Sequence, residues 1–561
     1  MMTFLKKYWN SVALAVIAIV FLCLRIPGLN QPYHQDEYKW AKIVAVNSPL
    51  AGTIPHPPLS EKTYILADRV FGNAHLRMMP FVLSMVNLFL VYVVVRKRYG
   101  KRVAMWAAAL FAISYYSILA SLMVDTDGQV LPLFFLLGVY AYDQWQEQKE
   151  KKKQIIWFVA FLCALALGML TKFSFVIPVA AFIVDWAWSH RESVSAKTRK
   201  KILISIGATL VVGVVGFVAA VHFIPALAAT QLVTYTSRFF NIAHRNVFQV
   251  MVQALKAVMY ASPLLIAPLF VARRDVFAKT RLWWIFLSIA LMFYLVIFDF
   301  SVGALDRYLQ AVVVPLVIMS SVFFTEVFED GWTLTKKQIL LPIVGGLGIL
   351  ALSFLPQVIP PHHPKTDWLI RVATLKWNFL FPFSGGSGPL GLYVSFLVIG
   401  VSFVAAVILC ILIRKKPLAK KMLVATLLVI GVVYNAVFAE EYLFGKINGY
   451  APVLLQHALA FISADTSIDN VISYNDIGSD ELTAMGKSFG RLYIDPQYDQ
   501  ANLKKVNSFS GYYLVIDLPH INQDSMYAKY FSSCTSLYHE VSQRITSDVY
   551  DCRKANELKP L

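Results

Sequence analysis

Charge is scarce in this sequence, and so are the short motifs that mark many common enzymes. Only 15% of the 561 residues are charged and 58% are hydrophobic, a balance far from that of soluble globular domains. The chain has no glycine-rich phosphate-binding loop, no Cys-x-x-Cys pair and no His-Glu-x-x-His. These absences exclude the familiar nucleotide-binding, dithiol-redox and zinc-protease motifs.

Cysteine is also rare, with five in the whole chain. Cys23, Cys163 and Cys410 lie inside apolar stretches, where a thiol packs as a small hydrophobic side chain. Cys534 and Cys552 lie in a polar tail. In an oxidising compartment this pair is able to form a disulfide, and in a reducing one both stay as thiols, so the sequence leaves the two states open.

Long hydrophobic runs are abundant instead. A run of about 18 to 25 apolar residues is long enough to cross a bilayer as a helix. We predict about thirteen spans, near residues 10–29, 77–95, 103–121, 129–146, 155–171, 173–189, 201–224, 250–271, 282–299, 308–328, 338–357, 390–413 and 420–439. The first is not predicted to be a cleaved signal peptide, because no small-residue cleavage site follows it. The predicted fold class is a polytopic α-helical membrane protein.

Basic residues indicate the orientation of these spans. If the spans alternate, every basic cluster falls on one side: Lys6-Lys7, Arg96–Arg102, Lys149–Lys153, Arg191–Lys201, Arg273–Arg281, Lys336-Lys337 and Arg414–Lys421. Short cytoplasmic loops carry an excess of Lys and Arg, so this side, with the N-terminus, is predicted to be cytoplasmic. The same clusters account for the net charge of +18. Because they are dispersed over short loops, no nucleic-acid partner is predicted.

The tail after the last span differs from the rest of the chain. From Glu440 onward it holds 15 of the 33 Asp and Glu residues, and an odd number of spans places it outside the cell. We predict a transmembrane domain over residues 1–439 and a soluble extracytoplasmic α/β domain over residues 440–561. Strands are predicted at Val471–Tyr474, Arg491–Ile494 and Tyr512–Ile516, with helices between and after them.

The predicted outer loops are long and unequal, while the inner loops are short and basic. The outer segments cover residues 30–76, 122–128, 225–249, 300–307 and 359–389. Because binding and catalytic residues concentrate on structured loops, a site is expected on this side. The sequence shows no internal repeat, which weighs against transporter folds made of duplicated halves.

Two motifs in the first outer loop carry reactive residue types. Asp36 and Glu37 are adjacent carboxylates, and repulsion between them raises their affinity for a proton, which suits a general base acting on a hydroxyl. His56-Pro57-Pro58-Leu59 follows, and its prolines hold the chain extended. Residues 59–71 are then predicted to lie as a helix in the membrane interface. A solvated loop end and an ordinary proline turn are the alternative interpretations.

Further acids and cations are predicted near the same surface. Asp125 and Asp127 lie in a very short outer connection, where acids are costly unless they have a task or a partner. Four residues are candidates for binding a lipid phosphate: Arg77, Lys172, Arg307 and Tyr308. Arginine suits bidentate phosphate contacts and lysine acts as a point charge, although each cation equally suits an interfacial anchor. Arg238, His244 and Arg245 are weaker candidates.

At these residues the chain resembles the polyprenyl-phosphate-dependent glycosyltransferases of the membrane GT-C class, in particular the protein O-mannosyltransferase and aminoarabinose transferase branch. The matching pieces are Tyr33-His34-Gln35-Asp36-Glu37-Tyr38, His56-Pro57-Pro58-Leu59, Phe71-Gly72, Leu76-Arg77, the basic stretch Arg96–Arg102, Asp127 and Arg307-Tyr308. The resemblance implies that Asp36 acts at the acceptor hydroxyl and that His56 lies near the donor phosphate. Asp125 or Asp127 matches the acid of the second outer loop, and we favour Asp127. The Trp-Trp-Asp motif of oligosaccharyltransferases is absent.

The resemblance predicts an inverting glycosyltransferase, with catalytic residues Asp36, Glu37, Asp125 and Asp127, that moves a sugar from a polyprenyl phosphate to a hydroxyl. The expected location is the plasma membrane, with reaction at its outer face. A transporter or lipid-linked-sugar flippase is the alternative, and a non-catalytic scaffold a further one. No metal ion is predicted to be required, but His34, Asp36, Glu37 and His56 offer ligands for a divalent ion. His362 and His363 are a weaker set.

Overall fold

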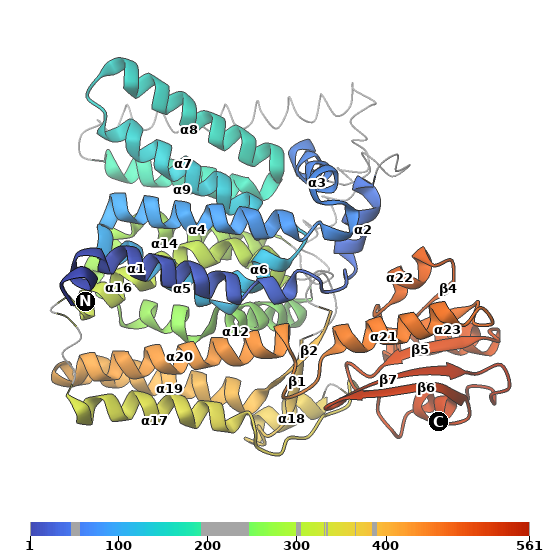
Figure 1. Ribbon diagram of the computed structural model, residues 1–561. Helices are drawn as coiled ribbons and strands as arrows, with labels where there is room; N and C mark the ends of the chain where they lie inside the picture. The colour runs from blue at the N-terminus through green and yellow to red at the C-terminus, as the bar shows by residue number, and fades with distance from the viewer. Residues whose placement is uncertain are drawn as a thin grey trace.

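A bundle of long helices makes up most of the molecule (Figure 1). The computed structural model describes residues 2–45, 56–191, 246–298, 305–329, 331, 335–364, 366–383 and 390–559. The long helices of the bundle are α1 (Met2–Cys23), α4 (Met78–Tyr99), α5 (Lys101–Ile113), α7 (Val130–Glu147), α8 (Lys151–Thr171), α9 (Val176–Ser189), α12 (Val247–Val271), α14 (Arg281–Met292), α16 (Val313–Val327), α17 (Lys336–Leu352), α19 (Phe396–Lys415) and α20 (Lys420–Leu443). Their apolar side chains form one continuous core.

Seven helices of the described residues are long and apolar enough to cross a membrane, or eight if the bent pair α5 and α6 (Tyr115–Leu122) counts as one span. Three further predicted spans correspond to shorter apolar helices at Phe173–Ser189, Arg281–Ile297 and Gln338–Leu352. The predicted span at 129–146 corresponds to α7, and the one at 201–224 lies outside the described residues. The fold is therefore a polytopic helical membrane protein, and the number thirteen stays a prediction.

The predicted spans are not all straight helices. The span at 103–121 is bent by 63° between α5 and α6. At this bend the buried guanidinium of Arg25 donates to the carbonyl of Ala112 at 2.9 Å and to Oγ of Ser117 at 3.1 Å, so it satisfies backbone that the bend leaves free. The span predicted from residue 390 begins only at Phe396, because Leu392–Ser395 form a strand instead.

Shorter elements gather at one end of the bundle. They are α2 (Asp36–Val44), α3 (Pro58–Phe71), α15 (Leu305–Tyr308), α18 (Thr366–Ala373) and the antiparallel hairpin of β1 (Leu380–Phe383) and β2 (Leu392–Ser395). Another short helix, α13 (Arg274–Lys279), joins α12 to α14. The predicted helix over 59–71 is thus present as α3. A π-helical turn, Phe293–Ile297, extends α14.

The C-terminal segment forms a unit of helices and a five-stranded sheet beside the bundle (Figure 1). Its elements are α21 (Ala451–Ala464), β3 (Val471–Tyr474), α22 (Ser479–Ala484), β4 (Ser488–Leu492), α23 (Asp499–Asn507), β5 (Tyr512–Ile516), α24 (Met526–Ser532), β6 (Thr535–Ser542) and β7 (Ile545–Asp551). The strand order is β4-β3-β5-β7-β6, with β3 parallel to β4 and β5 and the other pairs antiparallel.

Side-chain alternation along the strands divides this unit into layers. Val471 and Leu514 pack in the core that α21 covers, while Ile472 and Tyr513 pack in the core that α23 and α24 cover, as the period of two along a strand requires. Cys534 and Cys552 form a disulfide, so the oxidised alternative is the one the structure adopts. β4 begins earlier than the strand predicted at 491–494.

The two ends of the bundle differ in what they carry. The N-terminus and the α7–α8 and α19–α20 connections lie at one end, and α2, α3 and the C-terminal unit lie at the other (Figure 1). Both connections belong to the basic clusters used to orient the spans. The arrangement places the acidic tail and the candidate loops together, away from these clusters.

Candidate active site

Residues predicted from five separate stretches of the chain meet at the end of the bundle that carries α2 and α3. They are Asp36, His56, Asp125 with Asp127, Lys172, and Arg307 with Tyr308, which we call the acid–cation cluster. None of the stretches is adjacent in sequence, so the cluster exists only because the helices pack together.

Asp36 is held by the first turn of α2. Both Asp36 and Glu37 lie in this turn, where the helix dipole favours negative charge. The Asp36 carboxylate lies 2.5 Å from Nζ of Lys39 and 2.8 Å from Nη1 of Arg307, and its side chain is 28% exposed. It is therefore the carboxylate of the cluster that an incoming acceptor is best able to reach.

Glu37 points elsewhere, because successive residues of a helix are rotated by about 100°. Its two oxygens accept hydrogen bonds at 2.6 Å from Nη1 and Nη2 of Arg77, and both side chains are buried. The remaining donors of Arg77 go to backbone carbonyls of Gln31, Pro32 and Leu122. The expected repelling pair of carboxylates is therefore not formed.

This ion pair gives two of the predicted residues a structural contact. Glu37 also accepts from the backbone N–H of Val124 at 3.0 Å, so with Arg77 it joins α2, the start of α4 and the α6–α7 connection. The N–H groups of Arg77 are engaged by Glu37 and by backbone carbonyls, so the pair anchors these loops to one another. The phosphate-binding role of Arg77 and the catalytic role of Glu37 stay predictions.

Asp125 and Arg307 form the centre of the cluster. The Nε of Arg307 lies 2.9 Å from Oδ2 of Asp125, while its Nη1 faces Asp36, so one guanidinium joins both acids. Burial raises the pKa of Asp125, but the charges of Arg307 and Lys172 outweigh it and leave that pKa below its usual value. The hydroxyl of Tyr64 donates to the Asp125 carbonyl at 2.7 Å and holds the connection against α3.

Asp127 is fully buried and forms an ion pair with Lys172. Burial raises the pKa of Asp127 to about 6, and the neighbouring charge of Lys172 only partly opposes the rise. The next residue, Gly128, has no room for a side chain, since an added Cβ would lie 2.6 Å from Oε1 of Gln310 and 2.9 Å from the carbonyl of Ala120. The tight connection therefore keeps Asp127 facing the cluster.

Tyr308 brings the two cations together. Nζ of Lys172 lies 4.2 Å and the guanidinium carbon of Arg307 lies 4.8 Å from the centre of its ring, and Arg307 donates to its hydroxyl at 3.1 Å. Aromatic rings attract cations over their faces. The geometry thus concentrates two positive charges beside one aromatic ring, as binding of a phosphate needs.

His56 lies in the cluster, but as a neutral group. Its ring stacks on that of Trp40 with centroids 5.7 Å apart and an angle of 4° between the planes. Burial, together with the charge of Lys172, lowers the pKa of His56 to about 3. The imidazole is therefore uncharged at neutral pH, so what it offers to a phosphate is a hydrogen bond and not an ion pair.

Sequence reasoning missed several residues that shape the cluster. Trp40 supports His56, Tyr64 holds Asp125, and Lys39 pairs with Asp36. The positions of Trp40 and Lys39 on α2 carried a usable signal, because residues three and four after Asp36 lie on its side of a helix. Arg238, His244 and Arg245 lie outside the described residues.

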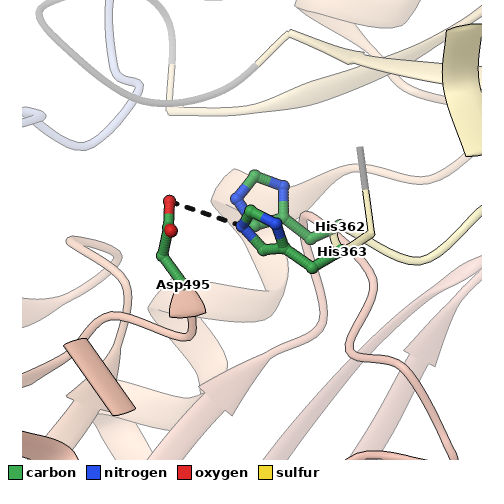
Figure 2. A group of neighbouring side chains, drawn as sticks. All are labelled: His362, His363 and Asp495. Carbon is green, nitrogen blue, oxygen red and sulfur yellow. Dashed lines mark ion pairs between the residues drawn. The ribbon is translucent and has the colours of Figure 1, made fainter. Parts of the chain in front are cut away.

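Metal ligands are brought together elsewhere. Over the parts of the chain that the structure describes, one group of three or more His, Cys, Asp or Glu residues has ligand atoms within 4.8 Å of one another, namely His362, His363 and Asp495 (Figure 2). His34, Asp36, Glu37 and His56 do not form such a group: Glu37 pairs with Arg77, and Asp36 pairs with Arg307 and Lys39.

Comparison with known proteins gives matches in sequence and in fold. Residues 55–219 match a family model described as dolichyl-phosphate-mannose-protein mannosyltransferase. No curated protein sequence matches the chain. The crystal structure of ArnT from Cupriavidus metallidurans bound to undecaprenyl phosphate matches with a TM-score of 0.53 at 15% identity, over 99% of each chain.

Two other solved structures are similar. ArnT from the same organism in the apo state matches with a TM-score of 0.52 at 14% identity, over 97% of this chain and 98% of that chain. The Pmt1–Pmt2 protein O-mannosyltransferase complex of S. cerevisiae bound to the sugar donor matches 39% of this chain and 34% of that chain at 18% identity, with a TM-score of 0.29.

These matches confirm the resemblance predicted from the motifs. The chain resembles the membrane glycosyltransferases of the GT-C class that use lipid-linked sugar donors. In its fold it is a GT-C-like polytopic helical membrane protein.

Proposed function

We propose that this protein is an inverting glycosyltransferase that moves one sugar from a polyprenyl phosphate to a hydroxyl acceptor at the outer face of the plasma membrane. The observation that carries the proposal is the acid–cation cluster, in which the partly exposed Asp36 lies 2.8 Å from Arg307 and Lys172 lies beside Tyr308. A base and two cations in one place are what the transfer needs.

The reaction is a single displacement. Asp36 accepts the proton of the acceptor hydroxyl while the hydroxyl oxygen attacks the anomeric carbon of the sugar. The bond from this carbon to the phosphate oxygen breaks, and the electron pair leaves with the polyprenyl phosphate. Arg307 and Lys172 stabilise the charge that builds up on the departing phosphate. Attack from the face opposite the phosphate inverts the anomeric centre.

Before the donor binds, the buried acids neutralise the charges of the two cations. Asp125 lies 2.9 Å from Arg307 and Asp127 pairs with Lys172, so neither cation is an isolated charge in a place where isolated charge is costly. When the donor phosphate enters, Arg307 turns from Asp36 to the phosphate, and Asp36 becomes available as the base. We assign Asp125 and Asp127 to positioning the cations.

The test is the Asp36→Asn variant of the purified protein, assayed for transfer from a polyprenyl-phosphate sugar to a hydroxyl acceptor. Losing a general base lowers the rate by about 10²- to 10⁴-fold. Asp524→Asn is the matched control, because Asp524 is exposed in the C-terminal unit. Transfer by Asp36→Asn at the rate of the control would refute the assignment. Movement of the labelled lipid-linked sugar across proteoliposomes without any transfer would favour the flippase instead.

The C-terminal unit is proposed to shape the approach of the acceptor. The amide of Gln35, next to Asp36, donates to Asp476, and Nζ of Lys42 lies 3.8 Å from Asp480. Between α2 and this unit lies a cleft of about 860 Å³, whose lining includes Tyr33, Tyr38 and Glu481. Aromatic rings and a carboxyl group are able to bind a polar acceptor beside the cluster.

Transfer is proposed to need no metal ion. Arg307 and Lys172 supply the positive charge that a divalent ion provides in other phosphate sites. Full transfer activity after exhaustive chelation is the expected result, and a loss of activity that one added metal restores would overturn it.

A further inference from the structure

We propose that His362, His363 and Asp495 bind a divalent metal ion of the zinc class, which fastens the 359–364 loop to the C-terminal unit. The site is separate from the acid–cation cluster and does not depend on the proposed transfer. The two histidines precede α18, and Asp495 follows β4, so the ligands come from two parts of the chain that are distant in sequence.

The chemistry of these side chains favours such an ion. Imidazole and carboxylate together suit zinc and its neighbours in the first transition series, whereas magnesium and calcium prefer oxygen ligands alone. Two neutral imidazoles and one carboxylate leave one positive charge on a divalent ion, which a bound hydroxide balances and a bound water leaves in place.

The geometry is close to what the ion requires. Figure 2 shows the two imidazole rings side by side, with the carboxylate of Asp495 facing them. Nε2 of His363 lies 3.4 Å from Oδ2 of Asp495. Tetrahedral zinc, with bonds of about 2.0–2.1 Å, separates its ligand atoms by about 3.3 Å. Since the ligand atoms all lie within 4.8 Å of one another, small side-chain rotations complete the set.

The backbone already holds the ligands in place. The N–H of His362 donates to the carbonyl of His520 at 2.8 Å, and the side chain of Asn522 donates to the carbonyl of His363 at 3.5 Å. Because the loop is docked by these bonds, less conformational entropy is lost when the ion binds. A cleft of about 480 Å³, lined by the three ligands and by Asp499, leaves room for a water as the fourth ligand.

The experiment uses the full-length protein in detergent, with any polyhistidine tag removed. The protein is loaded with Zn²⁺, freed of loose ions by gel filtration, and its metal content is measured by mass spectrometry. His363→Ala and Asp495→Asn are compared with His539→Ala. His539 is the matched control, because its Nδ1 lies 2.7 Å from Asp548 but, among the residues that the structure describes, it belongs to no group of three candidate ligands.

We expect about one zinc per chain in the unaltered protein and in His539→Ala, and a loss of affinity of at least about 10- to 100-fold in the two ligand variants. Equal retention in all four proteins, or none in the unaltered one, would overturn the proposal. Co²⁺ provides a second measurement on the unaltered protein, so the result does not depend on folding of a variant. Intense visible absorption of four-coordinate Co²⁺ is expected, and the weak spectrum of the hydrated ion would refute the site.

Discussion

Replacing Glu37 by Gln separates a positioning role from a catalytic one. The Glu37 carboxylate accepts hydrogen bonds from Nη1 and Nη2 of Arg77 and from the backbone N–H groups of His34 and Val124. A glutamine keeps one acceptor oxygen, but its NH₂ group replaces the other oxygen and faces N–H groups that need an acceptor. It also leaves the buried guanidinium of Arg77 without its counter-charge.

The magnitude follows from burial. The side chains of Glu37 and Arg77 are 4% and 5% exposed, and removing one partner of a buried ion pair costs about 3–5 kcal/mol. The matched control is Glu150→Gln, whose pair with Lys153 has side chains 55% and 61% exposed. Exposed pairs of this kind contribute about 0–1 kcal/mol, so the control should unfold almost as the unaltered protein does.

Two measurements decide the outcome. Equilibrium unfolding in detergent should show the loss of stability in Glu37→Gln, and a double-mutant cycle with Arg77→Met should show that the two effects are not additive. Transfer, assayed well below the unfolding midpoint, should fall by less than about tenfold, because Asp36 remains as the base. An unchanged unfolding midpoint together with a fall of about 10²-fold or more in kcat would show that Glu37 takes part in the chemistry.

Three further predictions follow from the structure. Burial raises the pKa of Asp127 to about 6, and its ionised form holds Lys172, so the rate of transfer should rise with pH to a plateau above about pH 6. The same rise should be seen in the His56→Gln variant, since the pKa of His56 is lowered to about 3. Loss of the rise in that variant would contradict its assignment to Asp127. Removing the disulfide with Cys534→Ala and Cys552→Ala opens a loop with a sequence separation of 18 residues and should cost about 3 kcal/mol of unfolding free energy, with the exposed Cys163→Ala as control. A cysteine placed at the exposed Ser508, with Cys534 and Cys552 replaced, should react with an impermeant thiol reagent in intact cells; reaction only after lysis would place the tail in the cytoplasm.

Much of the acid–cation cluster was predictable, because a charged side chain near the membrane costs free energy unless it has a partner. Asp125, Asp127 and Lys172 are charged residues in very short connections between apolar runs, and such charges persist only with a task or a partner. Their side chains are indeed buried and paired. The same reasoning did not predict that Arg77 pairs with the buried Glu37, since a cation paired with a buried acid and a cation awaiting a phosphate look alike in sequence.

Arg25 shows what sequence reasoning does not reach. It lies toward the end of the predicted span at 10–29, yet it is fully buried and donates to the carbonyl of Ala112 at the bend between α5 and α6. Hydropathy indicates how deep in the membrane a residue lies. The group that accepts its hydrogen bond, however, belongs to another helix. No local pattern indicates such a partner.

By itself, the sequence determined the class of fold and the list of candidate residues. Runs of apolar residues must be buried in a bilayer or in a core, and acids such as Asp36 are rare enough among them to be conspicuous. Only the tertiary structure decided the pairs: Asp36 with Arg307, and Glu37 with Arg77. The physical reason is that an ion pair acts over a few ångströms, whereas these partners are separated by 271 and 40 residues of chain. Which charges come within that range depends on how the helices pack.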